Sequence, residues 1–188
     1  MKGFYERWGF LVRALAVVVA AAWTIFAYYS AAHNTTIRTA LEYREQLRSE
    51  PLYDAWKQTM IVGLQDSKEK DAAVAAGGQT WKRYVFSRIR EAETRANFDI
   101  VMSFYNEVWE CVEQDICDRD TVLALFGGEA EQLYENYILH IACWRLLHND
   151  REYGRGLTSL VATNLWQRER RLPRDYKPSA KECAFDKP

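Results

Sequence analysis

Three glutamates recur at every third residue in the stretch 107-EVWECVEQD-115, where they form a regular set of chemically active side chains. Carboxylates can bind a pair of metal ions or transfer protons, and here they belong to Glu107, Glu110 and Glu113. A di-iron site in a helical bundle needs Glu-x-x-His, because side chains three residues apart project onto the same metal pair. No histidine follows these glutamates at that spacing, and they lie opposite the apolar stripe of the same predicted helix. The pattern therefore predicts a solvated helix face, since charged side chains avoid burial unless they are paired.

A second set of candidate ligands lies on one side of a predicted helix and comprises His140, Cys143, Trp144 and His148. Such a cluster is the one place in the sequence that hints at a metal ion or a haem iron. Zinc sites use closely spaced pairs such as CxxC or HxxxH, and neither spacing occurs in this chain. The sequence therefore predicts that His140 is a hydrogen-bonded core residue, and it predicts no metal ion and no cofactor.

The common catalytic signatures are absent from the sequence. No Gly-rich dinucleotide motif follows a strand pattern, and neither a phosphate-binding Walker loop nor a Gly-x-Ser-x-Gly elbow occurs. A net charge of -1, from 25 basic and 26 acidic side chains, also argues against a nucleic-acid-binding protein. We therefore expect no catalytic residue and no nucleic-acid partner.

Residues 10–29, FLVRALAVVVAAAWTIFAYY, carry a single charge and predict a membrane-spanning helix. At about 1.5 Å per residue, this stretch reaches roughly 30 Å, which is the thickness of the hydrocarbon core. Arg13 lies near one end, where its long side chain reaches the interface. A cleavable signal peptide is the alternative, because small residues follow at positions 30–32, but the presence of Met1 favours an uncleaved anchor.

One side of this helix is lined by small residues, which favours close packing against another membrane helix. At 100° per residue, five side chains fall within a narrow wedge, and a hydroxyl among them offers an interhelical hydrogen bond. We expect integral membrane subunits to dock on this stripe, which consists of Arg13, Ala16, Ala20, Thr24 and Ala27.

The side of the membrane that holds the remaining chain is not settled by charge, because three basic residues precede the span's core and three follow it. Cysteine spacing does not decide it either. Cys111 and Cys117 are six residues apart on one predicted helix, which is too far for a mutual disulfide, and other pairings of the four cysteines stay open.

The elements that position these side chains are all predicted to be helical, because apolar residues recur at intervals of three and four and no useful strand pattern occurs. After the membrane span, the sequence predicts a stalk over 36–48, a helix that has Pro51 in its first turn and ends near Gln65, and a polar loop over 66–80. A long helix follows over 81–116. Asp118 or Asp120 then caps a short helix that Gly127-Gly128 ends, and two further helices cover 129–148 and 157–166.

The fold class is therefore all-α, with a single N-terminal transmembrane helix followed by a small helical bundle. We divide the chain into the N-terminal flank with the span (1–33), the helical domain with its stalk (34–166) and an extended, proline-containing tail (167–188). On a cytoplasmic domain, the basic side chains of the tail would contact anionic lipid headgroups, with solvated disorder as the alternative. These side chains are Arg168, Arg170, Arg171 and Arg174.

Three segments together carry a resemblance to a protein family, and they are 34-NTTIRTALEYREQLRSEPLYDAW-56, 97-NFDIVMSFYNEVWECVEQDICDRDTVLALFGG-128 and 134-YENYILHIACWRLL-147. Their succession resembles an uncharacterised bacterial family with one N-terminal membrane helix and a helical domain. The resemblance implies this architecture and a domain in the cytoplasm, and it supplies no catalytic residue.

From these patterns we expect a non-enzymatic, single-pass protein of the bacterial inner membrane that serves as an accessory or scaffold subunit of a membrane complex. The alternative is a membrane-anchored sensor or enzyme with a ligand or metal pocket between the long helices. Such a pocket would lie near Tyr105, Trp109, His140 and Trp144.

Overall fold

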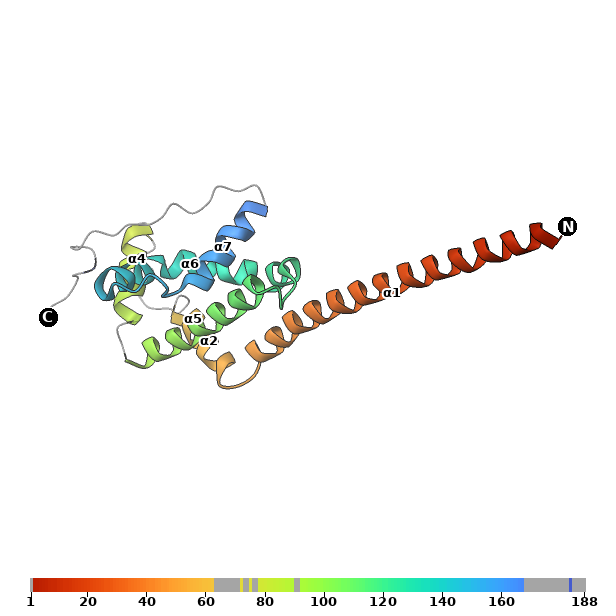
Figure 1. Ribbon diagram of the computed structural model, residues 1–188. Helices are drawn as coiled ribbons and strands as arrows, with labels where there is room; N and C mark the ends of the chain where they lie inside the picture. Colours follow the sequence, from red (N-terminus) through yellow and green to blue (C-terminus); the bar gives the residue numbers. More distant parts are fainter. Residues whose placement is uncertain are drawn as a thin grey trace.

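The computed structural model describes residues 2–62, 72, 75, 78–89, 92–167 and 183. Within these residues the structure is all-α, with six helices and no strand, as the sequence predicts. One very long helix projects from a cluster of shorter ones, and the N-terminus lies at its far end (Figure 1).

The long helix, α1 (Lys2–Leu47), joins the predicted membrane span to the predicted stalk without a break. Among the described residues, it is the one helix that is long and apolar enough to cross a membrane. Between Val12 and Tyr29 its large apolar side chains face outward, and Trp23 and Tyr28 each keep 71% of their surface exposed. The expectation of one apolar helix that runs into a stalk is confirmed.

The helical domain is built from α2 (Leu52–Val62), α4 (Gly78–Ile89), α5 (Ala92–Glu113), α6 (Arg119–His148) and α7 (Arg155–Gln167). The helix α5 packs against α2 and α7, and α6 packs against α7 and α4. Large aromatic side chains fill the space between them, and Phe98, Tyr105, Phe126 and Tyr137 are all fully buried. Burial of such rings supplies most of the drive for these helices to associate.

The three glutamates between residues 107 and 113 lie on a helix, α5, as predicted. Val101, Tyr105, Val108 and Val112 are buried in the core, whereas Glu107, Glu110 and Glu113 are exposed on the opposite face. The solvated-face interpretation is confirmed, and the carboxylates do not converge on a common site.

The prediction of one long helix over 81–116 is wrong, because α4 ends at Ile89 and α5 begins at Ala92. The two helices run in different directions (Figure 1). Whereas α5 lies along α2 and α7, α4 packs mainly on α6. The apolar stripe continues along the sequence from α4 to α5, although the two helices bury their apolar faces against different neighbours.

The prediction that Gly127-Gly128 ends a short helix is also wrong, because α6 continues from Arg119 to His148. The start was predicted correctly, since Asp118 caps α6 by accepting a hydrogen bond from the Thr121 backbone N–H at 2.8 Å. Gly127 serves packing instead of termination. A Cβ at this position would lie 2.6 Å from Cγ of Asn164, so the missing side chain lets α7 approach α6 closely.

The cysteines at 111 and 117 form a disulfide, which corrects the expectation that they are too far apart. Six residues of continuous helix would separate them by about 9 Å. However, α5 ends at Glu113, and the chain turns back through Asp115, whose φ is 56°. The backbone N–H groups of Ile116 and Cys117 both donate to the Cys111 carbonyl, and the two Cα atoms lie 5.2 Å apart.

A second disulfide joins Cys143 on α6 to Cys183, so all four cysteines of the chain are paired. Within the predicted tail (167–188), the structure describes Gln167, at the end of α7, and Cys183. The other tail residues, including Arg168, Arg170, Arg171 and Arg174, lie outside the described residues, as does most of the predicted loop over 66–80.

Candidate functional site

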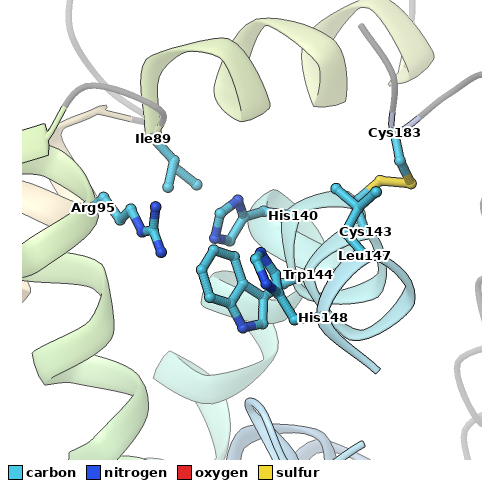
Figure 2. A pocket seen from close by; sticks show the side chains of 8 residues that line it. All are labelled: Ile89, Arg95, His140, Cys143, Trp144, Leu147, His148 and Cys183. Atoms are coloured by element: carbon cyan, nitrogen blue, oxygen red, sulfur yellow. A yellow bond between two sulfur atoms is a disulfide. The ribbon is translucent and has the colours of Figure 1, made fainter. Parts of the chain in front are cut away.

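A pocket of about 330 Å³ lies among the last residue of α4, the first turn of α5 and the C-terminal half of α6. The C-terminal half of α6, which carries most of the lining residues, lies at the end of the domain away from the N-terminus of α1 (Figure 1). The pocket lining combines three nitrogen-bearing side chains with an indole, apolar groups and a disulfide. Figure 2 shows these residues, which are Ile89, Arg95, His140, Cys143, Trp144, Leu147, His148 and Cys183.

The helix α6 supplies one wall of the pocket by simple periodicity. His140, Trp144 and His148 follow one another at intervals of four residues, so their side chains lie on the same face one turn apart. The Trp144 and His148 rings lie 3.8 Å apart between centroids. Aromatic stacking along α6 therefore orders this wall.

Arg95 comes from α5 on the opposite wall and points across the pocket toward His140 and Trp144 (Figure 2). Its guanidinium carbon lies 4.2 Å from the centroid of the Trp144 ring, which is a cation–π distance. Its Nε atom lies 3.8 Å from the carboxylate of Asp99, one turn further along α5. These two contacts fix the orientation of the guanidinium at the pocket.

His140 keeps only 5% of its surface exposed and is held in a short chain of polar groups. Its Nε2 atom lies 3.4 Å from the Tyr153 hydroxyl, and that hydroxyl donates to Asp99 at 2.6 Å. Burial lowers the pKa of His140 to about 4, and the nearby charge of Arg95 acts in the same direction. The imidazole is therefore neutral at pH 7.

Tyr153 is held protonated by the same surroundings. Burial and the neighbouring Asp99 carboxylate both raise the pKa of its hydroxyl well above the ordinary range. This hydroxyl donates its proton to Asp99 and lies 3.4 Å from Nε2 of His140, so it links the two side chains. Together, these groups form one polar side of the pocket, to which Arg95 adds a positive charge.

No set of side chains suited to metal binding accompanies this pocket in the described part of the chain. No group of three or more His, Cys, Asp or Glu residues there lies close enough together to hold a metal ion. The sulfur atoms at the pocket belong to the Cys143–Cys183 disulfide, so they are not free thiol ligands.

The structure brings together two of the four predicted pocket residues and separates the other two. His140 and Trp144 line the pocket described above. Tyr105 is fully buried in the core. Trp109 instead lines a smaller hollow of about 170 Å³ between α5 and α7, beside Glu110, Glu113 and Arg155.

Three members of the pocket network, Arg95, Asp99 and Tyr153, escaped the sequence reasoning. Arg95 and Asp99 are one turn apart on α5, and this i,i+4 pairing of opposite charges was visible in the sequence. Their meeting with α6 and Tyr153 depends on how α5 packs, which no local pattern reveals.

The predicted docking stripe on α1 is exposed along its whole length, at Arg13, Ala16, Ala20, Thr24 and Ala27. The Thr24 hydroxyl donates to the carbonyl of Ala20 at 2.8 Å, within the same helix. Its oxygen keeps acceptor capacity toward a partner helix. Apart from Arg13, the stripe therefore presents only small side chains to its surroundings.

A scan against protein-family models finds no match, and searches of the curated proteins and of the solved structures find no significant match either. The resemblance to a bacterial family of membrane-anchored helical proteins stays a prediction.

Proposed function

We propose that this chain is a non-enzymatic, single-pass protein of the bacterial inner membrane and an accessory or scaffold subunit of a membrane protein complex. The observation that carries the proposal is the exposure of α1. The apolar window of this helix has none of its surface buried by the rest of the chain, so lipid and a partner helix are its natural surroundings. Integral membrane subunits would dock on the small-residue stripe, and lipids would cover the bulkier side.

A fixed connection between α1 and the domain supports a scaffold role. Arg44 on α1 donates from both terminal nitrogens to Glu129 on α6, each at 2.7 Å. Closer to the membrane, the backbone N–H of Asp118 donates to the Thr36 carbonyl at 3.2 Å. A bidentate pair of this kind restricts direction as well as distance, so docking of α1 would set the position of the whole domain.

The two disulfides indicate on which side of the membrane the helical domain lies. Structural disulfides persist in oxidising compartments and are rare in the cytoplasm, where thiols are kept reduced. Since all four cysteines pair, we infer that the helical domain lies on the oxidising, extracytoplasmic side. This inference replaces the cytoplasmic placement that the sequence resemblance implied.

Substitution within the stripe tests the docking proposal. Ala20→Leu places a large side chain where close helix contact is expected, and it leaves the span apolar enough to insert. We expect the membrane subunits that co-purify with the natural protein to be lost. The matched control is Leu15→Ile on the opposite side of α1, which should leave co-purification unchanged. Retention of every membrane partner by the Ala20→Leu protein would refute docking through this stripe.

A second candidate function is that of a membrane-anchored sensor, and the preorganised pocket around Arg95, His140 and Trp144 favours it. Metal and haem analysis of protein purified from its native membrane separates the candidates further. A stoichiometric cofactor would contradict a purely scaffolding role, whereas a fixed set of co-purifying subunits would support it.

A further inference from the structure

The pocket between α4, α5 and α6 has the dimensions and the mixed lining of a small-molecule site. Its volume of about 330 Å³ falls at the lower end of the range for ligand pockets. Ile89 and Leu147 supply apolar surface, and Trp144 supplies a flat aromatic one. The polar groups are few and come from opposite walls, as in sites that orient a ligand (Figure 2).

The charges at the pocket favour an anion. Among the residues that the structure describes, no carboxylate belongs to the lining, which contains one guanidinium and two imidazoles. Asp99 lies behind this lining, where it accepts a hydrogen bond from Tyr153 and contacts the Nε side of Arg95. Asp150 is turned away, because its carboxylate accepts hydrogen bonds from the backbone N–H groups of Glu152 and Tyr153.

Arg95 offers the ligand a planar group with its terminal nitrogens directed into the pocket (Figure 2). A guanidinium in this orientation matches a carboxylate or a phosphate with two parallel hydrogen bonds. The stack of Trp144 on Arg95 and the contact with Asp99 hold the group in place before a ligand arrives, which lowers the entropy cost of binding.

The location of the pocket separates a dissolved ligand from a lipid headgroup. Asp118, at the start of α6, contacts Thr36 on α1, and His140 follows 22 positions later in the numbering, or about 33 Å along the helix. The C-terminal end of α6 lies on the side of the domain away from the N-terminus of α1 (Figure 1). Headgroups of the membrane that α1 crosses would therefore not reach it.

We propose that this pocket binds a small, water-soluble organic anion. Its carboxylate or phosphate group meets Arg95, while its apolar or aromatic body packs against Ile89, Trp144 and Leu147. The proposal does not depend on docking through α1, because the two sites lie at opposite ends of the chain and are tested with different variants.

Benzoate is a suitable probe, since it joins one carboxylate to a flat apolar body. Full-length protein in nanodiscs of zwitterionic lipid would be titrated with benzoate, with neutral benzyl alcohol and with acetate, by following the indole N–H resonance of Trp144. A Trp144→Phe sample assigns that resonance. We expect benzoate to bind and to shift it, and we expect benzyl alcohol and acetate each to bind at least about tenfold more weakly.

Two variants locate the site. Arg95→Gln should weaken benzoate binding by at least about tenfold, because it removes a charge-assisted hydrogen bond. Arg119→Gln changes an exposed arginine at the other end of α6 and should have no effect. Leu147→Trp fills the pocket from its exposed rim, so it should also abolish binding even if Arg95→Gln were to disturb the fold.

Three results would overturn the proposal. Equal binding of benzyl alcohol and benzoate would remove the requirement for an anion. Full affinity in both the Arg95→Gln and Leu147→Trp proteins would place the binding elsewhere, and no detectable benzoate binding would reject the ligand class. Nanodiscs that contain anionic phosphatidylglycerol separate the two sources of anion. Unchanged benzoate affinity in them supports a soluble ligand, whereas competition by this lipid would contradict one.

Discussion

Tyr105 is fully buried in the core, and Glu110, just over one turn further along α5, is exposed to solvent. Tyr105→Ala should lower the free energy of unfolding by about 3–5 kcal/mol, because it removes a large ring and leaves a cavity. Glu110→Gln should change it by less than about 0.5 kcal/mol, as expected of a surface position. Denaturant unfolding of both proteins in the same detergent measures the difference. Loss of a cellular function in Glu110→Gln with the fold intact would contradict the packing interpretation of this stretch.

The lowered pKa of His140 predicts how the free energy of unfolding depends on pH. The ordinary value is about 6.5, and the folded protein lowers it to about 4, so the unfolded chain binds a proton that the folded chain excludes between these values. Stability is therefore full above about pH 6.5, falls as the pH drops through this window, and levels off below about pH 4. The loss from this one group should reach about 3 kcal/mol.

Comparison with His140→Gln isolates that contribution, because carboxylates elsewhere also titrate at low pH. The free energy of unfolding of the natural protein should fall more steeply than that of the variant between pH 6.5 and about 4. Outside this window the two curves should run parallel. Parallel curves across the whole range would show that His140 is not excluded from protonation in the fold.

At the residue scale, the sequence predicts which side chains share one face of a helix, but it does not predict which side chains of different helices meet. His140 and Trp144 share a face of α6 by spacing alone, so their proximity was predictable. Arg95 lines the same pocket from α5, and Tyr153, in the turn before α7, contacts His140. Their positions depend on tertiary packing, which the periodicity of a single helix does not predict.

Gly127 and Gly128 are neighbours within α6 but have opposite surroundings. A Cβ on Gly127 would meet the side chain of Asn164, whereas a Cβ on Gly128 would meet nothing within 4 Å. The Asn164 side chain cannot move aside cheaply, because it is buried and donates a hydrogen bond to Glu131. Gly127→Ala should therefore destabilise the fold by about 1–3 kcal/mol through overpacking.

Gly128→Ala is the matched control, and it should stabilise the fold by up to about 1 kcal/mol, because alanine is the better helix former at an exposed position. Thermal unfolding of the two proteins side by side measures both effects. If the two substitutions changed stability in the same direction, the close approach of α6 and α7 at Gly127 would be wrong.

At the element scale, the helical content was predictable, as was the start of α6 at Asp118, but other helix boundaries were not. Apolar periodicity identified every described helix, but it joined α4 to α5 because the stripe continues across the break. It also divided α6 at two glycines that usually mark a helix end. Inside α6, packing of Asn164 of α7 over Gly127 overrides the local preference.

At the scale of the whole molecule, the apolar helix α1 and the pocket around Arg95 lie at opposite ends of one connected structure. Ala40 and Leu47 of α1 are buried in the domain, so the stalk is part of the core and not a loose tether. The bidentate Arg44–Glu129 pair ties α1 to α6, and the same α6 carries His140 and Trp144. A partner docked on α1 would therefore hold the pocket at a defined height above the membrane.

The two disulfides predict the side of the membrane on which the helical domain lies. With Cys111–Cys117 and Cys143–Cys183 both formed, an extracytoplasmic domain should contain no reactive thiol. Protein extracted from native membranes and denatured without reductant should take up no maleimide, and after reduction it should take up four. A single Cys111→Ser change should expose only the Cys117 thiol before reduction. A C-terminal alkaline phosphatase fusion should be active, because this enzyme needs an oxidising compartment for its own disulfides. Four reactive thiols before reduction together with an inactive fusion would instead place the domain in the cytoplasm, as the family resemblance implied.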